Sequence, residues 1–391
     1  MPPNFSLMQM RHFLLLFLFF LIFQPRAEAQ SLSPEATISI LTCDPGREVY
    51  SMYGHTAIRI QDPVQGLDAV FNYGVFSFES DNFLYRFAKG ETDYQLVGQR
   101  FSSFLREYEH DQRSVYEQVL NLSAEGKERL FNALLENAKP ENSVYRYNYF
   151  TDNCATRVRD MIEHNAGAAV HFPDQQSGET YRDLIDDFHH SFRWIDFGID
   201  LVISKPADVP IPFYAHMFLP EYLLDQFSKA EIASNGTPQP LVLETRTLIE
   251  FPNHKLESDI PWPAIIFGLI FLLITFISIR GYLKGKQYDR LDYWLLALTG
   301  LSGLVMSWLA LYSEHPALRP NYNILWAFPP NLVFAFLWAV KKWRPQLKYY
   351  FWLMGALLIL SVMMGQVFHP AVYFIILTLL VRVIVNLLPQ R

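Results

Sequence analysis

The chain has 391 residues and a net charge of −7, so it is longer than one ordinary domain and only modestly acidic. Hydrophobic residues make up 51% and aromatic residues 16% of it, which is more apolar than a typical soluble protein. The sequence has no basic stripe of the kind that follows a phosphate backbone, and this excludes nucleic acid as an expected partner.

The N-terminus carries a segment typical of exported proteins. Arg11 and His12 precede an apolar run over residues 13–23, and the tripeptide AEA at residues 27–29 fits a cleavage site with small residues. The run is short for a membrane-spanning helix, so we predict a secretory signal peptide over residues 1–29. An uncleaved anchor is the alternative, and under both interpretations the following segment is exported.

Residues 30–200 alternate strand and helix patterns, which predicts an exported α+β domain. After the turn residue Gly54, alternation predicts a strand that begins at His55. A helix pattern with regularly spaced leucines covers residues 123–138. Residues 201–258 are partly proline-rich, and we predict that they connect this domain to the membrane.

Five long apolar stretches then define a predicted transmembrane domain over residues 259–391. Each is long enough, or nearly so, to cross about 30 Å of hydrocarbon as a helix. The loops after the first and third are rich in Lys and Arg, which places them in the cytoplasm. We therefore predict a multi-pass inner-membrane protein with its N-terminal domain in the periplasm and its C-terminus in the cytoplasm. The stretches cover roughly residues 261–279, 293–312, 324–340, 350–367 and 371–388.

Polar residues in the membrane half raise two further questions. Glu314, His315, Asn321 and Asn323 follow the second stretch, on the side of the exported domain. A solvated turn is the favoured interpretation, and contact with that domain is the alternative. Arg382 falls inside the last stretch, where a charge is a functional candidate. Snorkelling or pairing within the bundle is an equal alternative for it.

The segment FTDNCATRVRD at residues 150–160 contains one of only two cysteines. Cap-type residues precede Cys154, and a helix pattern follows it, so the thiol is expected in the first turn of a helix. The helix dipole, with Arg157 and Arg159 nearby, favours the reactive thiolate there. Composition alone leaves three interpretations of Cys154 open: buried and inert, disulfide-bonded to Cys43, or catalytic.

A nucleophilic cysteine usually needs a base, and a third polar group usually orients that base. His55 is the candidate base, on one strand face with Ala57 and Arg59. Asn72 is the candidate orienting residue, because the next strand brings it within reach. No H-E-x-x-H or Cys-x-x-Cys pattern is present, so a zinc site is not predicted.

Three segments resemble a known family. LTCDPGREVYSMYGHTAIRI, FNYGVF and NYFTDNCATRVRD resemble the Lnb N-terminal periplasmic domain, named for the lipoprotein N-acyltransferase of Bacteroides, over roughly residues 35–200. EHPALRPNYNILW in the membrane half matches more loosely. The order of His55 before Asn153-Cys154 also resembles permuted NlpC/P60 and lecithin:retinol acyltransferase-like thiol enzymes, which implies a permuted papain-like fold. Those relatives often place a second histidine on the next strand, where this chain offers Asn72 or Tyr73.

The resemblance implies a lipoprotein N-acyltransferase that needs no metal or cofactor. Cys154 would take an acyl chain from a membrane phospholipid as a thioester and pass it to the α-amine of a diacylglyceryl-cysteine lipoprotein. His55 would be the base, oriented by Asn72. The alternatives are a cell-wall cysteine peptidase of the NlpC/P60 type, a phospholipase, and a non-enzymatic membrane-anchored binding module. The candidate substrate contacts are Arg157, Arg159, Asn153 and Tyr53.

Overall fold

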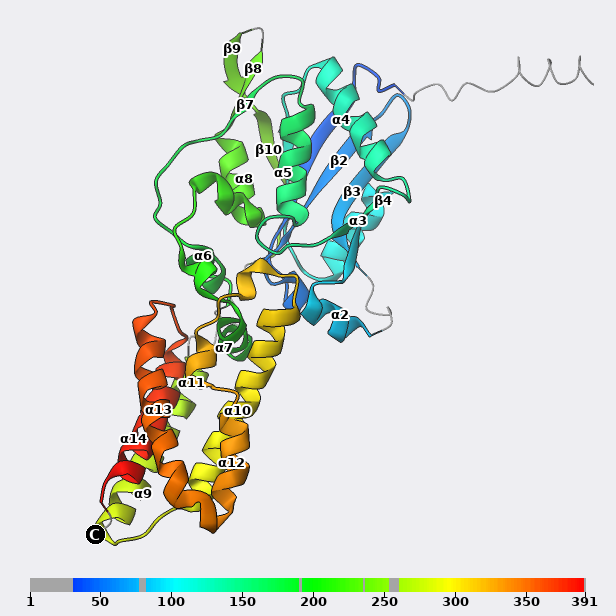
Figure 1. Cartoon of the computed structure of the whole chain (residues 1–391). Coiled ribbons are helices and arrows are strands. Elements are labelled where there is room, and N and C mark those ends of the chain that lie inside the picture. The colour runs from blue at the N-terminus through cyan, green and yellow to red at the C-terminus, as the bar shows by residue number, and fades with distance from the viewer. Residues whose placement is uncertain (1–30, 77–81, 190–191, 235, 253–259, 390–391) are drawn as a thin grey trace, which may run out of the picture.

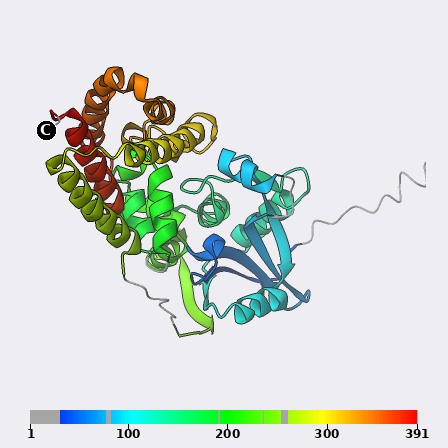
Figure 2. The same ribbon diagram turned by 90° about the horizontal axis from the view of Figure 1, so that it is seen from below.

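The computed structural model describes residues 31–76, 82–189, 192–234, 236–252 and 260–389. Within these ranges the chain forms an antiparallel-sheet domain and a helical bundle (Figure 1). Seen from below, the sheet domain extends to one side of the bundle (Figure 2). The α+β class predicted for the exported part is confirmed, and the predicted signal peptide lies outside the described residues.

The exported domain is built on a seven-stranded sheet with the strand order β10-β5-β1-β2-β3-β4-β6. Every neighbouring pair of strands is antiparallel. The edge strand β10 comes from the segment predicted as a connector, so the sheet domain extends beyond residue 200. The strands are β1 (Thr37–Cys43), β2 (His55–Asp62), β3 (Leu67–Val75), β4 (Asp93–Arg100), β5 (Val115–Leu120), β6 (Val144–Arg146) and β10 (Val242–Ile249).

Helices cover both faces of this sheet because its strands alternate apolar side chains on the two sides. Ile58 and Ile60 of β2 pack in the larger core with α4, α5 and α8. Ala57 and Val70 face the other way and pack against Phe104 of α3. These helices are α3 (Phe101–His110), α4 (Ala124–Asn137), α5 (Cys154–Asn165) and α8 (Pro220–Ser228).

Smaller elements complete the exported part. A three-stranded sheet has the order β7-β8-β9, and α2, α6 and α7 lie on the side toward the bundle (Figure 1). The strands are β7 (Val170–His171), β8 (Glu231–Ser234) and β9 (Thr237–Pro240). The helices are α2 (Phe83–Lys89), α6 (Tyr181–Asp186) and α7 (Arg193–Val202), with 3₁₀ turns η1 (Val49–Ser51), η2 (Lys205–Asp208) and η3 (Phe213–Phe218).

Among the described residues, the bundle has four helices of membrane-spanning length, not the five predicted. The third predicted stretch is divided in two, because Pro329 and Pro330 lack the N–H groups that a continuous helix needs. Its parts are α11 (Asn323–Trp326) and α12 (Asn331–Ala339), and a 3₁₀ turn, η4 (Pro316–Leu318), precedes them. The long helices are α9 (Trp262–Leu283), α10 (Asp289–Tyr312), α13 (Arg344–Met363, preceded by η5, Lys341–Trp343) and α14 (Pro370–Leu387).

The divided segment still runs from one end of the bundle to the other. Asn323 donates to the Asp200 carbonyl at 3.1 Å, at the end nearer the sheet domain. At the opposite end, Arg344 donates to the Trp338 carbonyl at 2.8 Å and pairs with Asp289 at the start of α10. The loops after the first and third predicted stretches therefore lie at the same end of the bundle, as the positive-inside argument requires.

The loop after α10 docks on the exported domain, so the expectation of a solvated turn is wrong. The Asn321 side chain donates to the Leu201 carbonyl at 2.8 Å. The Glu314 N–H donates to the Lys89 carbonyl, also at 2.8 Å. Backbone carbonyls at the ends of α7 and α2 thus find partners in the bundle, which ties the two parts together.

Arg382 pairs with Asp292 of α10 inside the bundle. Its Nε and Nη2 donate to the two carboxylate oxygens at 2.7 and 2.9 Å, and Nη1 donates to Ser278 of α9 at 2.9 Å. Asn386 donates to the same carboxylate at 3.0 Å. Because buried charges in a membrane need such partners, the structure favours pairing within the bundle over a site role.

Candidate active site

Cys154 is the first residue of α5, where the cap-type residues before it predict the start of a helix. The Asn153 side chain accepts from the N–H groups of Ala155 and Thr156, both at 2.9 Å. Thr156 Oγ1 accepts from the Asn153 N–H at 2.8 Å. This reciprocal capping box fixes the start of the helix and holds the half-buried thiol at the positive end of its dipole.

Hydrogen-bond donors surround the Cys154 sulfur. The N–H of Thr56 on β2 and the hydroxyl of Tyr147 both point to it, together with N–H groups of the first helical turn. Burial raises the pKa of the Cys154 thiol more than these donors lower it. The resting form at neutral pH is therefore the thiol, contrary to the expectation of a preformed thiolate.

His55 and Asn72 are in direct contact. His55 Nε2 lies 3.2 Å from Asn72 Oδ1, so the Nε2–H donates to the amide oxygen and Nδ1 is left as an acceptor. Burial, with the positive charge of Arg113, lowers the pKa of His55 to about 4, and the bond to Asn72 opposes that shift. The ring is thus neutral at physiological pH and able to accept a proton.

His55 and Cys154 reach the same end of the sheet from opposite faces. His55 alternates with Ala57 on the side of α3, whereas Cys154 packs with the core under α5. Pairing of β2 with β3 ends at Ala57 and Asn72, so the strands part there and the sulfur reaches the Thr56 N–H. Within the described residues no hydrogen bond joins His55 to Cys154, so proton transfer requires the ring to turn toward this gap.

Cys43 lies at the same end of the sheet, on the face that carries His55 and opposite the face that carries Cys154. It is the register partner of His55 and is only 1% exposed, in the small core with Phe104 and Tyr108. Both cysteines are free thiols, which removes the disulfide interpretation of Cys154. Burial raises the pKa of the Cys43 thiol to about 12, so this group is unreactive.

Three of the four candidate substrate contacts are committed within the fold. Arg157 donates to Asp152 at 2.8 Å, and Arg159 donates to Asp160 at 2.7 Å. The Asn153 amide is engaged by the capping box, and its NH₂ group donates to backbone carbonyls on two sides. These contacts favour structural roles for the three residues, because a phosphate would have to displace existing partners.

Tyr53, the fourth candidate, belongs to a buried chain of contacts that the sequence did not reveal. Its hydroxyl donates to His189 Nε2 at 2.6 Å, and His189 Nδ1–H donates to Asp196 Oδ1 at 2.8 Å. Asp196 Oδ2 lies 3.6 Å from Nε2 of His369, the N-cap residue of α14. Tyr53, which is two positions before His55, is therefore linked to the start of the bundle helix α14.

The same region holds a group with ligand-type side chains. Atoms of Asp186, His189 and Asp196 lie within 4.8 Å of one another, a spacing that can hold a metal ion. However, His189 Nδ1 is already bonded to Asp196, and burial with the neighbouring carboxylates of Asp200 and Asp196 raises the pKa of Asp186 to about 8. Both ring nitrogens of His189 already have partners, Tyr53 and Asp196, and we assign the group no metal role.

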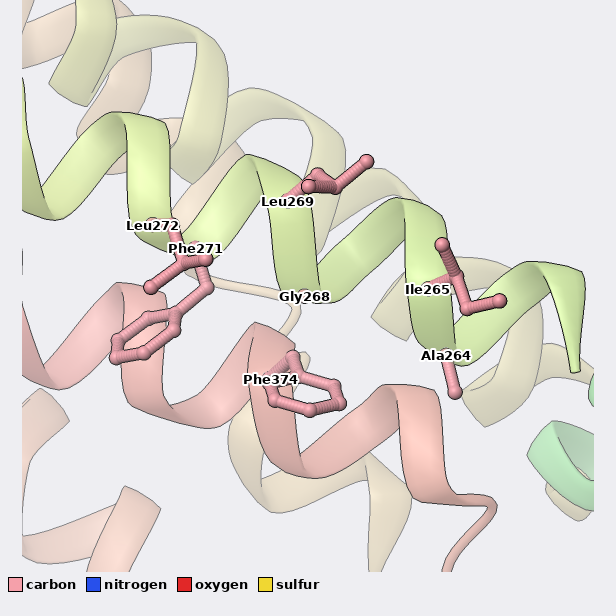
Figure 3. Close-up of a pocket in the computed structure, with 7 residues that line it drawn as sticks. All are labelled: Ala264, Ile265, Gly268, Leu269, Phe271, Leu272 and Phe374. Atoms are coloured by element: carbon pink, nitrogen blue, oxygen red, sulfur yellow. The ribbon is translucent and has the colours of Figure 1, made fainter.

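A shallow apolar pocket lies between α9 and α14 (Figure 3). Phe374 faces Gly268 across it, and a Cβ on Gly268 would lie 3.5 Å from the ring. All its lining residues belong to the bundle, so the pocket is separate from the cysteine site. They are Ala264, Ile265, Gly268, Leu269, Phe271, Leu272 and Phe374.

The fold and the site define a class of membrane protein in which a helical bundle carries an exported α+β domain with a candidate thiol site. Residues 23–187 match the Lnb N-terminal periplasmic domain, and residues 255–391 match the Lnb transmembrane domain. The chain therefore belongs to the Lnb family, as the sequence resemblance indicated. No curated protein and no solved structure matches it.

Proposed function

We propose that this protein is a lipoprotein N-acyltransferase with a Cys154 nucleophile. The observation that carries the proposal is the Cys154 thiol at a capped helix start, surrounded by donors, beside the strand that presents a neutral His55. The proposal includes a permuted papain-like arrangement, because the histidine strand precedes the cysteine helix in the chain. It also places the sheet domain in the periplasm at the inner membrane.

In the first step the thiol is acylated. His55, oriented at rest by its Nε2–H bond to Asn72, turns toward the sulfur, and its Nδ1 accepts the thiol proton as the Cys154 sulfur attacks the ester carbonyl of a membrane phospholipid. The Cys154 N–H and the Tyr147 hydroxyl are next to the sulfur and are suitable donors for the oxyanion. The carbon–oxygen ester bond then breaks, His55 returns its proton to the leaving oxygen, and a thioester and a lysophospholipid result.

In the second step the acyl chain moves to the acceptor. The α-amine of a diacylglyceryl-cysteine lipoprotein attacks the thioester carbonyl, and His55 accepts a proton from the amine. The carbon–sulfur bond breaks, and the sulfur regains its proton from His55. The product is an amide, so atoms and charge balance without a metal or an oxidant.

The attachment to the bundle supports a lipid substrate. The loop after α10 and the chain of contacts from Tyr53 to His369 join the cysteine domain to the membrane helices. A substrate that stays in a bilayer requires an active site held close to its surface. A soluble cell-wall peptide makes no such demand, and this observation favours acyl transfer over the peptidase alternative.

The decisive experiment uses a bacterium depleted of its own lipoprotein N-acyltransferase. The full chain and its Cys154→Ala variant are expressed to equal membrane levels, and mass spectrometry determines the acylation of a lipoprotein N-terminus. We expect triacylated lipoprotein with the unmodified protein and only diacylated lipoprotein with the variant. Diacylated product with both would refute the proposal, and lysophospholipid release without N-acylation would indicate a phospholipase.

A further inference from the structure

Aromatic rings continue without interruption from the Cys154 sulfur across the edge of the sheet. Tyr147, whose hydroxyl points to the sulfur, stacks on Tyr94 with ring centroids 4.3 Å apart. Tyr94 contacts Phe76 at 5.1 Å, and Phe76 stacks on Phe83 of α2 at 5.7 Å. Each ring touches the next, so these side chains form one continuous apolar surface.

This surface ends at the bundle. Phe83 stacks on Phe87 within α2 at 5.9 Å, and Tyr85 of the same helix contacts Trp308 of α10 at 5.7 Å. Trp308 in turn contacts Tyr312, the last residue of α10. Tryptophan and tyrosine near the end of a spanning helix are typical of the membrane–water interface. We call Tyr147, Tyr94, Phe76, Phe83 and Phe87 the aromatic series.

Tyr147 beside the sulfur is half-buried, and from Tyr94 onward solvent exposure increases through the half-buried Phe76 and Phe83 toward the bundle. Tyr94 is 8% exposed, whereas Phe87 at the far end is 51% exposed and its neighbour Tyr85 is 54% exposed. An ordinary core would bury such large rings, and exposed rings at the level of a membrane interface fit contact with lipid. The series is therefore most exposed at its end toward the bundle.

We propose that the aromatic series is the binding surface along which the acyl chain of the donor phospholipid reaches Cys154. The inference rests on the proposed acyl transfer and adds the place where the acyl chain binds. An acyl chain that leaves the bilayer for a thiol in the exported domain exposes methylene groups to water unless apolar side chains cover them. The series provides such cover from the membrane interface to the sulfur.

The pocket between α9 and α14 is the natural comparison surface. It is also apolar, but its residues lie only in the bundle helices α9 and α14 (Figure 3). Phe374 in that pocket and Phe83 in the aromatic series are both phenylalanines that contact apolar neighbours. The two therefore form a matched pair for truncation.

The test compares Phe83→Ala with Phe374→Ala in the full-length protein reconstituted in phosphatidylethanolamine vesicles. Initial rates of lysophospholipid release give kcat and KM for a donor with sixteen-carbon chains. We expect Phe83→Ala to raise KM about ten-fold with kcat nearly unchanged, because the lost contact is with the chain and not with the reacting atoms. Phe374→Ala is expected to leave both constants as they are.

Hydrolysis of p-nitrophenyl acetate, which has no long chain, reports the thiol chemistry of the same samples. We expect Phe83→Ala to match the unmodified protein with this ester. Unchanged KM for the long-chain donor, or equal loss with both esters, would overturn the proposal. Turnover of the acetate ester with no lipid turnover by the unmodified protein would count against the proposed function itself.

Photo-crosslinking tests the binding surface without turnover. Cys154→Ser protein is irradiated in vesicles that contain phosphatidylethanolamine with a diazirine at the end of one acyl chain, and labelled peptides are mapped by mass spectrometry. Labels in α2, reduced in Phe83→Ala, would support the aromatic series even if acyl transfer failed. Labels confined to the bundle helices, including the α9 and α14 pocket, would overturn it.

Discussion

The two cysteines lie on opposite faces of the sheet at the same end of it, Cys43 at the end of β1 and Cys154 at the start of α5, and their surroundings differ sharply. Cys43 is sealed under α3 beside Phe104 and Tyr108, and burial raises the pKa of its thiol to about 12. Cys154 is half-buried at a helix start, and donors from Thr56 and Tyr147 offset part of the same burial effect. Burial alone therefore gives an inert thiol, and burial combined with directed donors gives one that a base can activate.

The largest expected effect is at Cys154. Cys154→Ser replaces the sulfur with a poorer nucleophile while keeping a small polar side chain at the helix start. We expect acyl transfer to fall at least about 1000-fold, to the background rate. Lysophospholipid release and N-acylation should fall together, and retention of either reaction in the variant would show that the nucleophile is elsewhere.

His55 is expected to have the next largest effect. His55→Gln keeps a hydrogen-bonding side chain but removes the base, and we expect a loss of about 100-fold to 10,000-fold. In the unmodified protein the His55 pKa of about 4 leaves the ring neutral above that pH, so the rate should fall as pH drops through about 4. A rate profile that is flat down to pH 3 would contradict the role of His55 as base.

Asn72 allows a sharper pH test. Asn72→Asp places a negative charge beside His55 Nε2–H, which stabilises the imidazolium and raises the His55 pKa. The acid limb of the rate profile should therefore move upward by about one pH unit or more, with a loss near neutral pH of about ten-fold or less. Asn72→Ala is the control, since it weakens ring orientation without adding charge and should not move the limb upward.

The local structure around the candidate site could be predicted from the sequence, whereas contacts between distant segments could not. Gly54, with φ +83°, marks the start of β2, and the cap residues before Cys154 mark the start of α5. The raised thiol pKa depends on burial by distant segments, which a helix-dipole argument does not include. The contact of Tyr53 with His189 spans 136 positions and follows no motif.

The bundle and the edge of the sheet also differ from what the sequence predicted. Average hydropathy identified the third apolar stretch, but it did not register the break that Pro329 and Pro330 impose on its helix. Pairing of β10 with β5 joins segments more than 120 positions apart, so a composition-based boundary at residue 200 could not detect it. Sequence patterns thus describe each segment better than they describe which segments meet.

The smallest expected effect is at Cys43, and it completes the comparison of the two thiols. Cys43→Ala removes one buried sulfur next to Phe104, so we expect a loss of about 1 kcal/mol in the free energy of unfolding. Activity should stay within about two-fold of the unmodified protein, because the Cys43 thiol is sealed in the small core with Phe104 and Tyr108 and its pairing with His55 is made by the backbone. Iodoacetamide labelling of the folded protein, mapped by mass spectrometry, should modify Cys154 and leave Cys43 unmodified. Equal labelling of both, or loss of activity in Cys43→Ala comparable to that in Cys154→Ser, would show that the sheet does not separate an inert thiol from a reactive one.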